Sequence, residues 1–136
     1  MRLLPYLGEL PPQVPVAPGW PHDDTAPGLA FAAGGAWTWL ILDDDGRIAG
    51  ECGVKALPDA DGTVEIGYGL AAPSRGRGLG TRAVAALLDE LTQREGVRVV
   101  EADVAVGNVA SRRILERLRF TVVETGGRDV RYRLVV

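Results

Sequence analysis

Residues 64–81 read VEIGYGLAAPSRGRGLGT, and this stretch decides the fold. A β pattern ends at Leu70, a basic turn with alternating glycines follows, and an amphipathic helix begins near Gly80. Free N–H groups at a helix N-terminus, backed by the helix dipole, bind phosphate oxygens, and glycines let the backbone come close. Arg75 and Arg77 add positive charge. The stretch therefore predicts a phosphate-binding strand–turn–helix unit.

Hydrophobic patterns predict the elements on either side of this unit. Residues 37–42, 47–54 and 63–70 alternate as strands between polar turns, which indicates an antiparallel meander. After Gly80, Val84, Leu87 and Leu91 recur at helical spacing, and Gly96 is placed to end that helix. A strand over 97–106 follows, so strand, helix and strand imply a parallel crossover.

The last third of the chain predicts a second helix and a hairpin. Asn108 can cap a helix that runs to about Leu118, with Ile114, Leu115 and Leu118 facing inward. Residues 120–124 and 129–136 then form a hairpin around Gly126 and Gly127. Together these elements predict one mixed α/β (α+β) domain over residues 1–136.

The first 35 residues differ from the rest. Seven of the nine prolines lie among the first 27 residues, and each fixes φ and removes a hydrogen-bond donor. We therefore expect residues 1–35 to form an irregular segment and residues 36–136 to form the core. A short helix is expected within this segment, with Thr25 as its cap, Pro27 in its first turn and Gly34-Gly35 as its end.

Composition excludes several classes of function. The formal net charge is −3 and Lys55 is the only lysine, so no basic field predicts a nucleic-acid partner. The absence of a long apolar run or a signal-peptide pattern predicts a cytoplasmic protein without a membrane span. Cys52 is the only cysteine, which excludes internal disulfides and cysteine metal clusters and favours a buried strand position. We expect no metal site.

Two motifs carry a resemblance to a known family. The first is Arg75-Gly-Arg-Gly78-Leu-Gly80; the second is Asn108-Val-Ala-Ser111, followed by a helix that ends before Phe120. Their order and separation resemble the GNAT superfamily of acetyl-CoA-dependent N-acetyltransferases, in the branch of ribosomal-protein N-terminal acetyltransferases. The resemblance implies a mostly antiparallel sheet with one parallel crossover at the cofactor site and helices on both faces. The N-terminal region is short by comparison, and the resemblance implies that residues 1–35 lie on the acceptor side.

The resemblance also implies a cofactor site. Backbone N–H groups of residues 77–81 would hold the pyrophosphate of acetyl-CoA, and Gly67 and Gly69 would let its pantetheine arm approach the strand. An N–H near residues 68–70 would polarise the thioester carbonyl. The cofactor residues implied are Tyr68, Gly69, Leu70, Arg75, Gly76, Arg77, Gly78, Leu79, Gly80, Thr81, Asn108 and Ser111.

Direct acetyl transfer to a primary amine requires a base and an acid, because a protonated amine has no lone pair and the thiolate must leave. Glu65 is the first candidate for the base, ahead of Glu101, Asp103 and His22. Each of these residues could also be a surface or helix-capping side chain without a catalytic role. Leu115 occupies the position where many relatives carry a tyrosine acid, so Ser111 is the candidate acid.

Two alternatives to an enzyme stay open at this point. An acyl-CoA-binding domain without turnover would also use the cofactor loop. A nucleotide binder is disfavoured, because residues 76–81 lack the third glycine of G-x-G-x-x-G. The amine acceptor is not identified by the sequence.

Some remaining features bear on the acceptor, on assembly and on stability. Trp20, Trp37 and Trp39 either line an acceptor pocket or, for the last two, form one packed strand face. A homodimer through the apolar strand 129–136 is one expectation. Arg119 stands where the family usually has a helix-ending glycine, so either it adopts a left-handed conformation or the helix ends differently, at a cost of roughly 1 kcal/mol.

Overall fold

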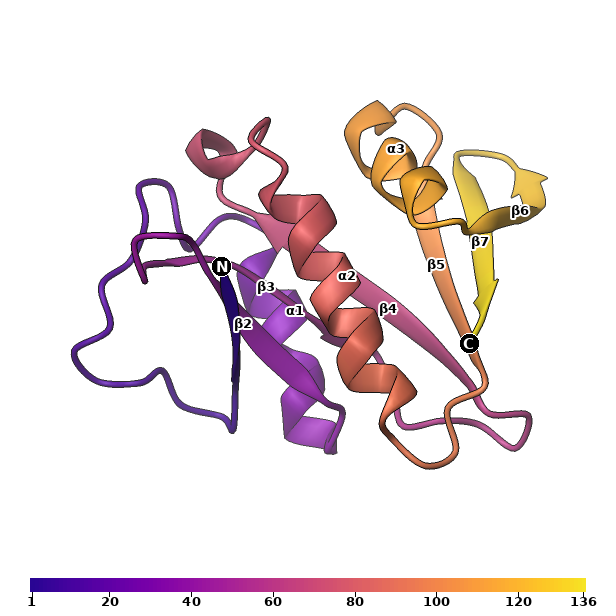
Figure 1. The fold of residues 1–136 in the computed structure, drawn as a ribbon, viewed down its shortest axis with the longest axis horizontal. Coiled ribbons are helices and arrows are strands. Elements are labelled where there is room, and N and C mark those ends of the chain that lie inside the picture. Colours follow the sequence, from indigo (N-terminus) through magenta and orange to yellow (C-terminus); the bar gives the residue numbers. More distant parts are fainter.

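A computed structural model describes all residues from Met1 to Val136. Its centre is a seven-stranded sheet in the order β1-β2-β3-β4-β5-β7-β6 (Figure 1). The strands are β1 (Arg2–Pro5), β2 (Thr38–Leu42), β3 (Ile48–Val54), β4 (Thr63–Leu70), β5 (Val99–Ala105), β6 (Thr121–Gly126) and β7 (Asp129–Val135). The meander of β2, β3 and β4 and the closing hairpin of β6 and β7 are confirmed.

The only parallel pair in the sheet joins β4 to β5. It extends over three residue pairs, from Thr63 with Val99 to Glu65 with Glu101. Beyond Glu65 the two strands diverge, as Figure 1 shows. The last five residues of β4 therefore have a ladder partner on the β3 side and none on the β5 side.

Helices cover both faces of the sheet, as expected. Helix α2 (Leu79–Thr92) connects β4 to β5 and lies in front of the sheet in Figure 1, whereas α1 (Thr25–Ala30) lies behind it. A 3₁₀ turn, Phe31–Gly34, continues α1. Helix α3 (Val109–Arg117) begins at Asn108, whose side chain accepts a hydrogen bond from the Ser111 N–H at 3.1 Å, as predicted for a cap.

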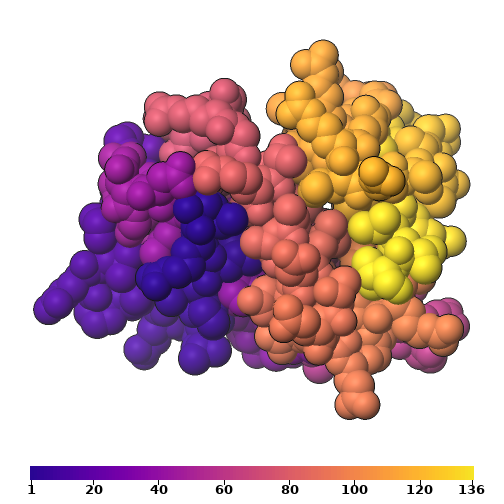
Figure 2. Space-filling view, in the orientation of Figure 1, coloured from indigo at the N-terminus to yellow at the C-terminus, as the bar shows by residue number.

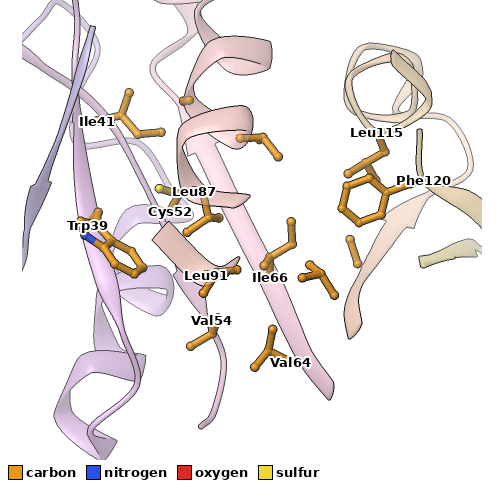
Figure 3. Packing of buried hydrophobic residues seen from close by; sticks show 14 of the residues in the cluster. Trp39, Ile41, Cys52, Val54, Val64, Ile66, Leu87, Leu91, Leu115 and Phe120 are labelled. Carbon is orange, nitrogen blue, oxygen red and sulfur yellow. The ribbon is translucent and has the colours of Figure 1, made fainter. Parts of the chain in front are cut away.

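The main core lies between α2 and the sheet (Figure 3). Ala83, Val84, Leu87 and Leu91 face inward from α2 at helical spacing and are fully buried. Cys52 is buried among them on β3, and burial raises the pKa of its thiol. Helix α3 contributes Leu115, which packs near Phe120 on the β5 side (Figure 3). These contacts fix α2 and α3 on the two sides of the gap between β4 and β5.

The N-terminal segment is more regular than the sequence indicated. Arg2–Pro5 forms the edge strand β1, paired antiparallel with β2, so the expectation of irregular structure over residues 1–35 is wrong for these four residues. Pro5 is tolerated there because it ends a strand at the sheet edge, where a missing N–H costs least. Thr25 does not cap α1: Asp24 holds the cap position without a side-chain hydrogen bond, and the Thr25 hydroxyl is used elsewhere.

The closing hairpin limits how a homodimer could form through residues 129–136. Strand β7 lies between β5 and β6 and is hydrogen-bonded on both sides, so its backbone is not available to a partner chain. The hairpin's outer strand β6 forms the sheet edge instead. Arg119 has φ 71, so it takes the left-handed conformation that the sequence raised as one possibility. No helix in the structure is both long enough and apolar enough to cross a membrane.

Candidate functional site

A cavity of about 560 Å³ opens between the glycine loop and α3. It occupies the region where β4 and β5 diverge, and Figure 2 shows a notch between the glycine loop and α3 at the top of the molecule. We call it the cofactor-side cavity. Its lining residues are His22, Asp24, Tyr68, Gly69, Leu70, Arg75, Gly76, Gly78, Gly80, Thr81, Asn108, Ala110, Ser111, Arg113, Ile114 and Arg117.

The glycine loop presents backbone and positive charge to this cavity. Gly76 and Gly78 have φ of 79° and 77°, which only glycine adopts without strain, and nothing lies within 4 Å of where their Cβ atoms would be. Gly78 is the N-cap of α2, so the N–H groups of the first turn have no side-chain cap. Arg75 is anchored by a hydrogen bond from Nε to the Leu70 carbonyl oxygen at 3.1 Å. The loop is therefore a preformed anion cradle.

Two hydroxyl groups meet on the opposite wall of the cavity. Tyr68 on β4 and Ser111 in the first turn of α3 place their side-chain oxygens 2.5 Å apart. Burial raises the pKa of Tyr68 most; the hydrogen bond to Ser111 lowers it by less, and the nearby Tyr132 adds a smaller upward effect. The net upward shift keeps the Tyr68 hydroxyl protonated, so it can donate.

A buried carboxylate lies on the other side of β4. Glu51 on β3 is 4% exposed and faces Gly69 across the strand pair. Its Oε1 accepts hydrogen bonds from Trp20 Nε1 at 3.1 Å and Thr25 Oγ1 at 2.7 Å. Its Oε2 lies 3.0 Å from His22 Nε2. Three donors from the N-terminal segment therefore hold this carboxylate in place.

The orientation of His22 is fixed from both ring nitrogens. Its Nδ1 accepts a hydrogen bond from the Asp24 N–H at 3.2 Å, which assigns the ring proton to Nε2 and makes Nε2 the donor to Glu51. A Cβ on Gly69 would lie 2.5 Å from Glu51 Oε2 and 2.8 Å from His22 Cε1. Gly69 is therefore required for the packing of this pair, a reason that the sequence did not reveal.

A second, smaller cavity of about 230 Å³ continues from Glu51 along the α1 face of the sheet. Asp24 and Tyr68 line both cavities, so the two adjoin at these residues. We call the smaller one the Gly67 groove. Its lining residues are Asp24, Gly28, Phe31, Glu51, Cys52, Gly53, Val54, Lys55, Gly67 and Tyr68.

The chain matches the model of one protein family, the acetyltransferase (GNAT) domain, over residues 13–121. It belongs to the GNAT acetyltransferase family. No protein of curated function matches the sequence at a significant level.

Solved structures share the GNAT fold at low identity. The ribosomal-protein-S5-alanine acetyltransferase from Vibrio fischeri has a TM-score of 0.64 and 18% identity, over 74% of this chain and 61% of that one. RimL, a ribosomal alpha-N-protein acetyltransferase in complex with coenzyme A, has a TM-score of 0.69 and 23% identity, over 82% and 68%. The protein yncA from Salmonella typhimurium, assigned as an acetyltransferase and bound to acetyl-CoA, has a TM-score of 0.65 and 25% identity, over 82% and 73%. The chain thus spans about three fifths of the length of the Vibrio fischeri protein.

Most of the residues predicted to bind the cofactor line the cofactor-side cavity. Only Arg77 and Leu79 are outside its lining: Arg77 donates from Nη2 to the Pro73 carbonyl oxygen at 3.3 Å, and Leu79 is buried in the core. Ser111, the predicted acid, lies in the cavity beside Tyr68. No group of three or more His, Cys, Asp or Glu side chains is arranged to hold a metal ion.

Glu65, the predicted base, lies apart from both cavities. It is near the start of β4, where it pairs with Lys55 Nζ and, at 3.5 Å, with Arg131 Nη2. Arg131 also contacts Glu101 at 3.5 Å and Asp103 at 3.3 Å, so these three acidic residues share one ion-pair network. Glu65 lines neither cavity, so its role as a base stays a prediction.

Sequence reasoning missed Glu51 as a candidate and ranked His22 low. In the sequence Glu51 stands between Gly50 and Cys52 in a strand that is buried throughout. An acidic residue inside a fully apolar strand is a signal, because such a group is rarely buried without partners. The partners themselves are 26 to 31 residues away in the chain and only the fold brings them together.

Proposed function

We propose that this GNAT domain transfers an acetyl group from acetyl-CoA to a primary amine in a ternary complex, without a covalent enzyme intermediate. One observation carries the proposal: an anion cradle and a buried, triply hydrogen-bonded carboxylate lie on opposite sides of the same strand end. Cys52 is buried in the core with a raised pKa, so it is not available as a nucleophile. The RimL and yncA structures, which contain coenzyme A and acetyl-CoA, support the choice of cofactor.

The cofactor-side cavity fits a coenzyme A thioester by its donors and its shape. The uncapped first turn of α2 and Arg75 suit the pyrophosphate. Tyr68, Gly69 and Leu70 at the end of β4 line this cavity and lack a ladder partner on the β5 side, so their backbone groups are free to pair with the peptide-like pantetheine arm. When bound, acetyl-CoA supplies a thioester at which the C–N bond forms as the C–S bond breaks. Consumption of acetyl-CoA fits the cytoplasmic location that the sequence predicts.

Glu51 is the base in this proposal. It lines the Gly67 groove, and its Oε2 lies against Gly69, which lines the cofactor-side cavity. A carboxylate accepts protons and, with three donors around it, keeps a fixed orientation. His22 and Thr25 position Glu51, and Glu51 takes the proton of the incoming ammonium group. Glu65 is the competing candidate from the sequence.

Ser111 and Tyr68 act together on the leaving group. Ser111 donates its proton to the departing sulfur and takes one from the Tyr68 hydroxyl through the hydrogen bond between the two oxygens. Water in the open cavity then returns a proton to Tyr68, so both hydroxyl groups end the step protonated. The N-terminal end of α3 adds a positive potential that favours a thiolate. Tyr68 thus provides, from β4, the tyrosine hydroxyl that is missing at Leu115 on α3.

Calorimetric titration of acetyl-CoA and CoA into the wild type and Gly78→Trp tests cofactor binding. We expect the wild type to bind both and Gly78→Trp to bind neither, because the indole ring fills the cradle beside the first turn of α2. Thermal unfolding of both proteins checks that the variant is folded. CoA release with a panel of primary amines then separates an enzyme from an acyl-CoA-binding domain: binding without release from any amine would reject acetyl transfer.

A further inference from the structure

No contact or backbone conformation within the protein explains why residue 67, on the floor of the Gly67 groove, is a glycine. Gly67 lies inside β4, opposite Gly53 on β3. Its backbone is not in the left-handed region, and a Cβ at this position would meet only Lys55 Cε, at an ordinary contact distance of 3.6 Å. Glycine weakens the interior of a strand, so a position that accepts a side chain and lacks one indicates that something else uses the space.

The two neighbouring glycines on this face differ from Gly67. A Cβ on Gly53 would lie 2.3 Å from the Trp37 carbonyl oxygen, and one on Gly69 would lie 2.5 Å from Glu51 Oε2. Both are therefore required by contacts within the protein. Gly67 alone of the three keeps open a surface that the fold does not fill, and that surface is the floor of the groove.

The groove has a direction. The acidic residue Asp24 also lines the cofactor-side cavity, and Glu51 pairs across the strands with Gly69, which lines that cavity too. The only cationic lining residue, Lys55, follows the other end of β3 and pairs with Glu65 near the start of β4. Phe31, which is 38% exposed, supplies an apolar contact from the turn after α1. An ammonium group is therefore attracted to the end beside Glu51, and the chain that carries it runs past Gly67.

The size of the groove limits what it accepts. Its volume of about 230 Å³ is below the roughly 300–1,000 Å³ of cavities that enclose drug-sized ligands. A slender chain fits beside a glycine floor, whereas an acceptor with several rings does not.

We propose that the Gly67 groove is the acceptor site, and that the missing side chain at Gly67 selects a primary amine on a slender, unbranched chain. This inference rests on the proposed acetyl transfer, and it assigns the specificity of that transfer to one residue. Gly69 lines the cofactor-side cavity and Gly67 does not, so only Gly69 is placed for the role beside the pantetheine arm that the sequence suggested for both glycines. Changes at Gly67 are therefore expected to affect the acceptor and to leave the cofactor in place.

A binding experiment tests the groove without requiring turnover. The probe is a stable adduct in which the sulfur of CoA is joined through an acetyl linker to the α-amine of triglycine. We expect the wild type to bind this adduct at least tenfold more tightly than CoA, Gly67→Ala to lose part of that gain, and Gly67→Leu to lose all of it. All three proteins are expected to bind CoA equally.

Gly126→Ala is the matched control. Gly126 is also a strand glycine outside the left-handed region, and nothing lies within 4 Å of its Cβ position, but it is on β6, away from both cavities. We expect it to keep the full gain in affinity. Neither Gly67→Ala nor Gly126→Ala is expected to lower the thermal unfolding midpoint, because alanine reduces the entropy of the unfolded chain.

The outcomes separate the inference from the proposed function. Equal adduct affinity in the wild type and Gly67→Leu, or no gain over CoA in the wild type, would overturn the acceptor site. A gain that depends on Gly67, without CoA release from triglycine or from any other amine of the panel, would support the groove and reject acetyl transfer. If CoA is released with triglycine and the KM for triglycine is the same in Gly67→Leu as in the wild type, acetyl transfer is supported and the groove is rejected as the acceptor site. If an aminoglycoside releases CoA as efficiently as triglycine does, selection by size is rejected.

Discussion

The two sides of β4 are built in different ways. On the cofactor side, backbone N–H groups, two glycines with positive φ and an arginine come from one short stretch of sequence. On the Glu51 side, a buried carboxylate is held by Trp20, His22 and Thr25, none of them close to it in the chain. The first side is a binding surface made by local backbone conformation. The second is a hydrogen-bonded cluster that exists only when the N-terminal segment is docked.

Under the proposed function, this difference is expected to separate cofactor binding from proton transfer. A change to the Glu51 cluster is expected to affect proton transfer while the anion cradle stays intact, and a change to the cradle is expected to do the reverse. The cluster is also more sensitive to conservative substitution, because loss of one acceptor leaves several buried donors without a partner. The predictions that follow test this separation, from the largest expected effect to the smallest.

Glu51→Gln is expected to reduce kcat/KM for the amine by about 10²–10⁴-fold, because a general base contributes a factor of that size. The affinity for acetyl-CoA, measured by titration, should stay the same. Glu65→Gln is the matched comparison, since Glu65 is the base that the sequence favours and it lies in a partly exposed ion pair. A large loss in Glu65→Gln with none in Glu51→Gln would reverse the assignment of the base.

Arg75→Ala tests the cradle side. We expect roughly 10-fold weaker acetyl-CoA binding, because a charge-assisted hydrogen bond to phosphate contributes about 1.5–3 kcal/mol and an exposed arginine delivers the lower part of that range. At saturating acetyl-CoA, kcat should be close to that of the wild type. A fall in kcat without a change in acetyl-CoA affinity would contradict the separation of the two sides.

Tyr68→Phe is expected to lower kcat by roughly 10-fold or less, because a thiolate with a pKa near 8.5 needs little assistance to leave. The raised pKa of Tyr68 adds a stability effect with a definite sign. Burial keeps the folded state protonated above pH 10 while the unfolded state ionises, so this contribution is intact below pH 10 and is lost as the pH rises through the folded value. Urea unfolding from pH 9 to 11 should therefore show a steeper loss of stability in the wild type than in Tyr68→Phe.

Arg119→Gly changes neither side of β4 and serves as a test of stability alone. Glycine relieves the left-handed strain at φ 71, so we expect the free energy of unfolding to rise by up to about 1 kcal/mol, with activity unchanged. Denaturant unfolding measures the effect. Destabilisation of the variant would show that tertiary contacts of the Arg119 side chain outweigh the backbone strain.

Sequence patterns predicted most of the elements because their signals are local. The glycine loop, the helical spacing on α2 and the Asn108 cap each lie within a few residues and were found in place. Strand β1 was missed because four residues with a terminal proline give almost no periodic signal. Thr25 was misassigned as a cap because its hydroxyl bonds to Glu51, 26 residues away, in place of its own helix.

The sequence by itself determined the fold family and the position of the anion cradle, because an anion cradle at a helix N-terminus is a property of consecutive backbone groups. Only the tertiary structure decided which carboxylate is buried beside that cradle and which glycine leaves a groove open. Residues 20–25 dock against β3 and surround Glu51 with hydrogen-bond donors. The pairing of β3 with β4 leaves no room for a side chain at position 69 but does leave room for one at position 67. Both facts depend on distances between residues far apart in the chain, which no local pattern contains.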